Sequence, residues 1–92
     1  MKSNKVDRKT KSLSQKITDI LKQVHIGERW VHYKNPNNTY IILEVGIIEK
    51  TEEVSIIYKS EYGDRLIWIR PYQEFLGKVK VNGNLINRFT RV

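Results

Sequence analysis

The chain has 92 residues and a net charge of +7, which is enough for one small domain and no more. Charged residues make up 29% and hydrophobic residues 39%, as in ordinary globular domains, and no apolar run is long enough to span a membrane. The absence of cysteine excludes disulfides and thiolate metal sites, and it fits a reducing compartment.

Residues 1–11 are polar, charged and without periodicity, and we expect them to form a disordered basic tail. Most of the positive charge lies near this end, because residues 1–25 contain seven Lys or Arg against only Asp7 and Asp19. Such a segment can attract polyanions, although a solubilising leader is the commoner role. No apolar stretch follows its lysines, so we expect no secretory signal and a cytoplasmic location.

An amphipathic helix is predicted over residues 12–26. Ser12 can cap its start with Gln15 three residues on, and Gly27 can end it. One face is apolar and consists of Leu13, Ile17, Ile20, Leu21 and Val24. A helix this short is marginal alone. We expect it to pack on the sheet domain or on a second copy of itself, with membrane-surface binding a weaker third alternative.

The hydrophobic period changes from helical to two after Gly27. Strands are predicted over Arg29–Tyr33 and Tyr40–Ile48, joined by a turn at Asn35–Asn38. The alternation in the second strand predicts that its odd positions face inward. These positions are Ile41, Leu43, Val45 and Ile47.

The alternation continues to the end of the chain. Val54, Ile56 and Tyr58 predict a third strand. Further elements are then a turn at Tyr62–Asp64, a strand at Leu66–Ile69, a single helical turn at Pro71–Leu76 and a strand around Val79 and Val81. Asn82-Gly83 is typical of a type I′ hairpin turn into Leu85-Ile86.

Five or six short strands with tight turns indicate a mainly β domain over residues 27–92. A sheet this small is protected best if it closes on itself. The helical turn before the last long strand favours a small SH3-like antiparallel β-barrel of five to six strands, to which the N-terminal amphipathic helix is an addition.

The order of short motifs resembles a family of bacterial and phage domains of unknown function, DUF1653. Its phrases are roughly H-Y-K-G, a Y-G turn, W-V-R-P with Phe four residues later, and a closing P-R-F. The matching positions, within about residues 27–90, are His32-Tyr33-Lys34, Tyr40-Ile41-Ile42-Leu43, Val54–Tyr58, Tyr62-Gly63, Trp68-Ile69-Arg70-Pro71, Phe75, Val79, Gly83 and Arg88-Phe89. The resemblance implies an SH3-like barrel and no established reaction.

The chain departs from the family pattern at three positions. Asn35 replaces the usual Gly, Asn87 replaces the Pro before Arg-Phe, and Glu61 replaces the common Leu before Tyr-Gly. The first turn is therefore expected to be rebuilt around Pro36. The helical leader lies outside the family core, and the resemblance implies nothing about its role.

The sequence offers little that could carry catalysis. Only His25 and His32 are available as imidazole ligands, and no Cys or paired acids stand at ligand spacing, so we expect no metal site. No serine lies in a nucleophile elbow, and no glycine-rich loop precedes a helix. We therefore expect no catalytic residues, no cofactor and no enzyme activity.

Aromatic residues interleaved with basic ones favour a binding surface instead. The candidate ligand-binding residues are His32, Tyr33, Lys34, Tyr58, Tyr62, Trp68, Arg70 and Arg88. Trp68 and Arg70 share one face of their strand. They are surface groups if Ile67 and Ile69 point inward. If Trp68 is core, Arg70 needs a buried carboxylate partner such as Glu44 or Glu74.

For Tyr58, Trp68 and Phe89 the alternative role is barrel core, with Arg88 capping a carbonyl; for Phe89 we expect that role. The favoured function is a non-catalytic module for nucleic acid or a nucleotide. The alternative is a protein–protein interaction module, or a phage or host regulator, that uses the barrel groove or the N-terminal helix. We expect no membrane partner, and a monomer or a weak homodimer through that helix.

Overall fold

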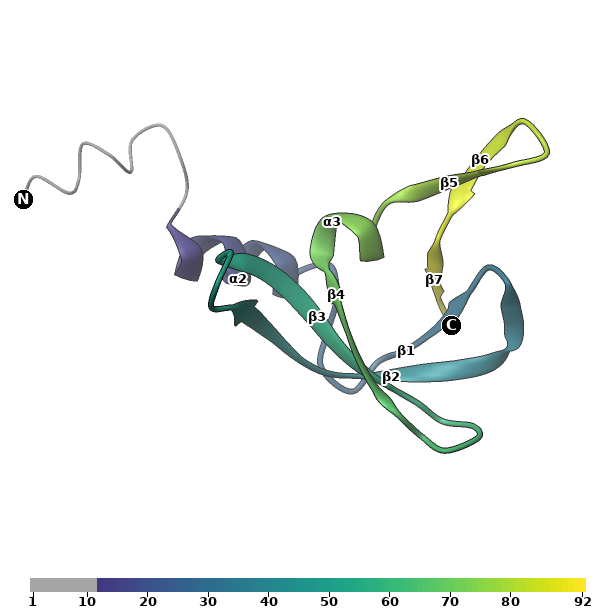
Figure 1. Cartoon of the computed structure of the whole chain (residues 1–92), viewed down its shortest axis with the longest axis horizontal. Helices are drawn as coiled ribbons and strands as arrows, with labels where there is room; N and C mark the ends of the chain where they lie inside the picture. Colours follow the sequence, from purple (N-terminus) through teal and green to yellow (C-terminus); the bar gives the residue numbers. More distant parts are fainter. Residues whose placement is uncertain (1–11) are drawn as a thin grey trace, which may run out of the picture.

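The structure, a computed structural model, describes residues 12–92, so the predicted tail at residues 1–11 lies outside it. The fold is mainly β with one helix before the strands (Figure 1). Its elements are α2 (Leu13–Leu21), β1 (Arg29–His32), β2 (Asn35–Ile48), β3 (Glu53–Ser60), β4 (Ile67–Pro71), α3 (Tyr72–Phe75), β5 (Lys78–Val81), β6 (Asn84–Asn87) and β7 (Phe89–Arg91).

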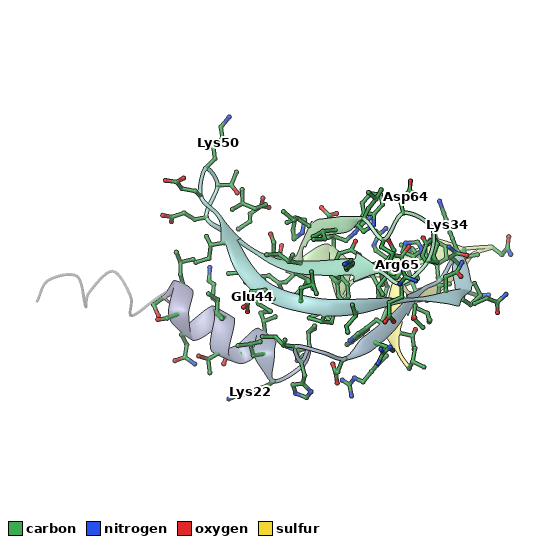
Figure 2. The ribbon with its side chains drawn as sticks, turned by 90° about the horizontal axis from the view of Figure 1, so that it is seen from below. Lys22, Lys34, Glu44, Lys50, Asp64 and Arg65 are labelled. Atoms are coloured by element: carbon green, nitrogen blue, oxygen red, sulfur yellow. The ribbon has the colours of Figure 1, made fainter. Side chains whose placement is uncertain are left out.

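Helix α2 begins as predicted, because the Ser12 side chain accepts a hydrogen bond from the Gln15 N–H at 3.2 Å. It ends at Leu21, earlier than expected, and residues 22–27 form turns. Ile20 and Val24 are fully buried, so the apolar stripe packs on the chain's own sheet (Figure 2). Across residues 12–92 no helix has the length and apolar character needed to cross a membrane.

The expected barrel is not closed. The strands form a five-stranded antiparallel sheet in the order β4-β3-β2-β1-β7, and β5 and β6 form a separate two-stranded sheet. Closure fails because the chain uses its late strands for a hairpin that projects from the body instead of bridging the two sheet edges (Figure 1). An SH3-like relationship therefore stays a prediction.

The inward face of β2 was predicted correctly only at Val45. A bulge at Leu43 shifts the register between Ile42 and Glu44, so Ile42 is buried before the bulge and Val45 after it, whereas Ile41 and Leu43 are only partly buried. Ile47 is exposed near the end of the strand. Because one extra residue reverses the alternation, a strict period of two cannot hold along the whole strand.

The predicted turn at Asn35–Asn38 is also wrong, because these residues belong to β2. The chain reverses one step earlier, at Tyr33 and Lys34, with His32 paired to Asn35. Residues 36–38 then bulge out of the ladder before Thr39 pairs with Val31. The bulge accommodates Pro36, which has no N–H to donate.

The second half of the domain follows the expected pattern. Val54, Ile56 and Tyr58 are all buried on one face of β3. Asn82 and Gly83 both adopt positive φ (51° and 83°), as a type I′ turn requires. The predicted helical turn is α3. Gly77, just after it, lies so close to the backbone of α3 that a Cβ atom at this position would be 2.6 Å from the Gln73 carbonyl oxygen.

Phe75 lies at the centre of the core and is fully buried. Its ring stacks on Phe89 at 4.1 Å between centroids and an interplanar angle of 10°. The rings of Trp30 and Tyr58 meet it edge-on at 5.4 and 5.2 Å. One aromatic side chain thereby joins α3, β7, β1 and β3.

Phe75→Ala should therefore lower the free energy of unfolding by about 3–5 kcal/mol, the usual loss for a buried phenylalanine. Leu85→Ala is the matched control, because Leu85 is exposed on the projecting hairpin and its loss should stay within about 0.5 kcal/mol. Urea denaturation measures both values. Equal losses in the two variants would contradict the central place of Phe75.

Glu61 connects the sheet to the turn between β3 and β4. Its carboxylate accepts both hydrogen bonds of a forked contact from Arg29 (2.9 and 3.0 Å) and one from the Thr39 hydroxyl at 2.7 Å. These hydrogen bonds, first from Arg29 and then from Thr39, lower the pKa of Glu61. The family's common Leu at this position is thus replaced by the acceptor of an ionic cluster.

A lowered pKa in the folded state stabilises the protein above the ordinary glutamate value of 4.5, and this contribution disappears as the pH falls through the lowered value. The difference in unfolding free energy between the parent and Glu61→Gln should be largest above about pH 4.5 and shrink in more acidic solution. Denaturation at several pH values measures it. The control is Glu49→Gln, since Glu49 forms no ion pair within residues 12–92; a pH-independent Glu61→Gln difference would contradict the contact.

Candidate functional site

A cleft of about 230 Å³ opens where the core face of the sheet reaches its edge at β4. It is lined by His32, Lys34, Asn35, Tyr40, Tyr58, Trp68, Arg70 and Phe89. Five of the eight predicted site residues are thus brought together from β1, the following turn, β3 and β4. Tyr33, Tyr62 and Arg88 do not line it.

Strand pairing explains how Trp68 and Arg70 reach this cleft. Trp68 pairs with Tyr58 and Arg70 with Ile56, so both lie on the same face of the sheet as the core. Because β4 is the edge strand, Trp68 is still 46% exposed. Its indole N–H donates to the Ser60 hydroxyl at 3.3 Å, which fixes the ring.

The sequence left open whether Trp68 and Arg70 lie at the surface or in the core, and the structure shows features of both. Trp68 and Arg70 face the core side yet remain accessible, whereas Ile67 and Ile69 point to the opposite face and are exposed. Arg70 pairs with Glu74, one of the two predicted carboxylates, at 3.2 Å. Its Nε also donates to the Tyr58 hydroxyl at 3.5 Å, a long contact.

His32 lies at the inner wall of the cleft. Its ring meets Phe89 edge-on at 4.9 Å between centroids and lies beside Tyr33 at 4.7 Å. The backbone N–H of Lys34 donates to His32 Nδ1 at 3.1 Å, so Nδ1 is an acceptor and the ring proton is on Nε2. The imidazole is therefore held in its neutral form.

Burial and the charges around the cleft also favour the neutral form of His32. Burial lowers the pKa of His32, and the positive charges of Arg70, Arg88 and Lys34 lower it further. Besides burial, the three cations around this neutral imidazole oppose its protonation, and together they make the cleft a site of positive potential. An anion in this cleft would relieve the repulsion.

Two further cations lie near His32: Lys34 lines the cleft, and Arg88 lies outside the lining yet close enough for its charge to act on the imidazole. Arg88 Nε donates to the Glu74 carbonyl at 3.1 Å, so it caps a carbonyl, as the alternative role predicted. Lys34 extends over the Tyr33 ring, with Nζ 5.8 Å from the centroid. In the part of the chain that the structure describes, neither cation has a carboxylate partner.

Two aromatic residues that line the cleft have structural roles, and two other lining residues were missed. Phe89, as predicted, and Tyr58 are buried in the core, although both also line the cleft. Tyr62 reaches it indirectly, through a 2.7 Å hydrogen bond to the Tyr40 hydroxyl. Burial and then this bond raise the pKa of Tyr40, so Tyr40 stays neutral. Tyr40 and Asn35 were not predicted as site residues. Tyr40 does belong to a stretch that matches the family pattern, and Asn35 is one of the positions that depart from it.

A second hollow of similar volume lies between α2, α3 and the β2–β3 turn. Its charged lining residues are Lys16, Glu52 and Glu53, and it holds none of the predicted site residues. Of these two hollows, the first cleft is therefore the one that the predicted site residues line. Among residues 12–92, no three His, Asp or Glu side chains lie close enough together to hold a metal ion.

Comparison with known proteins agrees with the motif pattern. The family model described as "Protein of unknown function (DUF1653)" matches residues 28–91. The chain belongs to the DUF1653 family. A crystal structure of a DUF1653 protein from Bordetella bronchiseptica is similar, with 22% identity and a TM-score of 0.63, over 76% of this chain and 90% of that one. No curated protein matches at a significant level.

At 22% identity, the likeness to the Bordetella DUF1653 structure supports the fold alone. The predicted family membership is confirmed, but neither the family description nor this structure assigns a ligand. The chemistry of the cleft in this DUF1653 domain must therefore be argued from its own side chains.

Removing one of the surrounding cations should raise the pKa of His32. In Arg70→Gln, the pKa should rise toward the ordinary histidine value of 6.5, measured by NMR titration of the imidazole. The control is Lys50→Gln, because Lys50 lies at the opposite end of the sheet from Lys34 (Figure 2). An unchanged His32 titration in Arg70→Gln would show that the charge of Arg70 does not act on this ring.

Proposed function

We propose that the domain is a non-catalytic binding module whose cleft takes single-stranded nucleic acid or a nucleotide. The observation that carries the proposal is the convergence of Lys34, Arg70 and Arg88 around His32. Beside them, Trp68 presents an accessible indole. Cations for phosphate next to a ring for stacking are the two parts that single-strand recognition needs.

The cations and the Trp68 ring would contribute separately to the free energy of binding. The three cations around His32 have one carboxylate nearby, that of Glu74, and its pairing with Arg70 is at the surface and thus worth about 0.2–1 kcal/mol. A phosphate can displace that weak contact and gain charge-assisted hydrogen bonds. Stacking on an aromatic side chain contributes about 1–3 kcal/mol per base and does not depend strongly on base identity.

The dimensions of the cleft favour contact with one or two nucleotides. A volume of about 230 Å³ is below the usual size of a pocket that encloses a whole small molecule. The cleft also opens at the edge of the sheet, where a strand can pass across it. We therefore favour a single strand lying over the cleft, and a free nucleotide is the weaker ligand.

The alternative, a protein-interaction module that uses the N-terminal helix, has less support. The apolar side chains of α2 already pack against the sheet, with Ile20 and Val24 buried. A partner or a second copy would have to use the remaining polar side chains of the helix.

The proposal predicts that a labelled single-stranded DNA binds with an affinity that falls steeply with salt. Lys34→Gln should weaken binding uniformly across sequences and reduce the salt slope by about one phosphate contact. Trp68→Ala should cost about 1–3 kcal/mol and leave the salt slope nearly unchanged. Fluorescence anisotropy at several salt concentrations measures both effects.

The matched control is Lys50→Gln, which removes the same charge far from the cleft (Figure 2). If Lys50→Gln weakens binding as much as Lys34→Gln, the attraction is general and the cleft is not the site. The proposed function fails if DNA, RNA and nucleotides all give no binding at low salt.

A further inference from the structure

We propose that the free edge of β4 pairs with the same edge of a second copy of this chain, forming a two-fold symmetric dimer. β4 is the last strand of the five-stranded sheet, and among residues 12–92 no strand pairs with its second edge. On this strand Ile67 and Ile69 are 58% and 61% exposed. The exposed part of this edge, Ile67-Trp68-Ile69, is apolar and uncharged, which favours strand pairing, whereas Arg70 and Pro71 protect the end of the strand.

The hydrogen-bond pattern shows which backbone groups are available. The Ser60 N–H donates to the Leu66 carbonyl at 3.0 Å, so Leu66 points its polar groups toward β3. In an antiparallel ladder the direction alternates with each residue. The N–H and C=O groups of Trp68 and Arg70 therefore also point toward β3, and those of Ile67 and Ile69 point outward along the free edge.

The backbone cannot pair further at either end of this free edge, and the groups that remain available for pairing are centred on Trp68. At one end Pro71 has no N–H to donate. At the other end the Arg65 N–H is already bound to the Tyr62 carbonyl at 3.0 Å. Antiparallel pairing about Trp68 would let Ile67 bond with the partner's Ile69, and Ile69 with the partner's Ile67, forming about four hydrogen bonds.

The side chains fit the same register. On the outer face, Ile67 and Ile69 would meet their counterparts and extend the row that Ile57 begins as the cross-strand neighbour of Ile69. Arg70, the charged residue of β4, would lie opposite the partner's Leu66, so no like charges would face each other. The sequence Ile-Trp-Ile reads the same in both directions, which suits a two-fold axis better than it suits a strand from another protein.

This register has a geometric consequence that does not depend on the proposed ligand. A two-fold axis perpendicular to the sheet keeps both core faces on the same side, so the two clefts would meet across Trp68 and the partner's Trp68. The dimer would have one continuous ten-stranded antiparallel sheet.

Light scattering during size-exclusion chromatography, across a range of concentrations, should give the mass of a dimer that dissociates on dilution. Ile69→Lys places a charge at the free edge and should leave a monomer. Leu85→Lys, which changes a residue of similar exposure on the separate hairpin, should leave the dimer unchanged. Circular dichroism should show the same fold for all three proteins.

A single cysteine tests the register, because the chain has no cysteine of its own. At position 68 the two Cα atoms would be about 4.5 Å apart, within disulfide range, so Trp68→Cys should cross-link on oxidation. Ile67→Cys is the control, because residue 67 and the partner's Ile67 lie diagonally at about 7–8 Å and should cross-link far less.

The proposal is overturned by a monomer at every concentration, by an open polymer, by a dimer that survives Ile69→Lys, or by equal cross-linking at positions 67 and 68. These outcomes are independent of nucleic-acid binding, since the oligomeric state is measured without ligand. Binding of an extended peptide by a permanently monomeric chain would assign the edge to another protein.

Discussion

The stacked rings of Phe75 and Phe89 hold this small domain together. One ring comes from the helical turn α3 and the other from β7, so the stack joins α3 to the last strand of the chain. Trp30 and Tyr58 meet Phe75 from β1 and β3. Because the sheet does not close on itself, β4 and β7 lie at its opposite edges, and this aromatic cluster connects α3, which follows β4, to β7 and β1.

The candidate site depends on the same cluster. Phe89 supports the imidazole of His32, and α3 places Glu74 beside Arg70 and the carbonyl that Arg88 caps. The cations are thus held around His32 by contacts that also stabilise the fold. An anion that entered the cleft would meet cations already in place, so little entropy would be lost in ordering them.

Much of this organisation could be predicted from the sequence, because it depends on local signals. The capping of Ser12, the inward face of Val54, Ile56 and Tyr58, and the turn at Asn82-Gly83 each follow from residues close together in the chain. The grouping of basic and aromatic side chains near β4 was also partly predicted, since the motif order places them on neighbouring strands.

The errors arise where distant residues decide the outcome. The bulge at Leu43 follows from how β2 fits against β3, and no local pattern in β2 reveals it. Whether the barrel closes could be predicted only with the knowledge that β5 and β6 pair with each other and not with the main sheet. The accessibility of Trp68 depends on β4 being an edge strand, which is a property of the sheet and not of the strand.

The projecting β5–β6 hairpin has a consequence for how such a domain can change over evolution. Its base is fixed by the Arg88 N–H bonded to the Gly77 carbonyl at 3.0 Å, and its tip contributes no side chain to the buried core. Residues can be inserted or replaced at that tip without disturbing the interior. A longer tip would therefore change the reach of the hairpin and leave the buried core of this domain as it is.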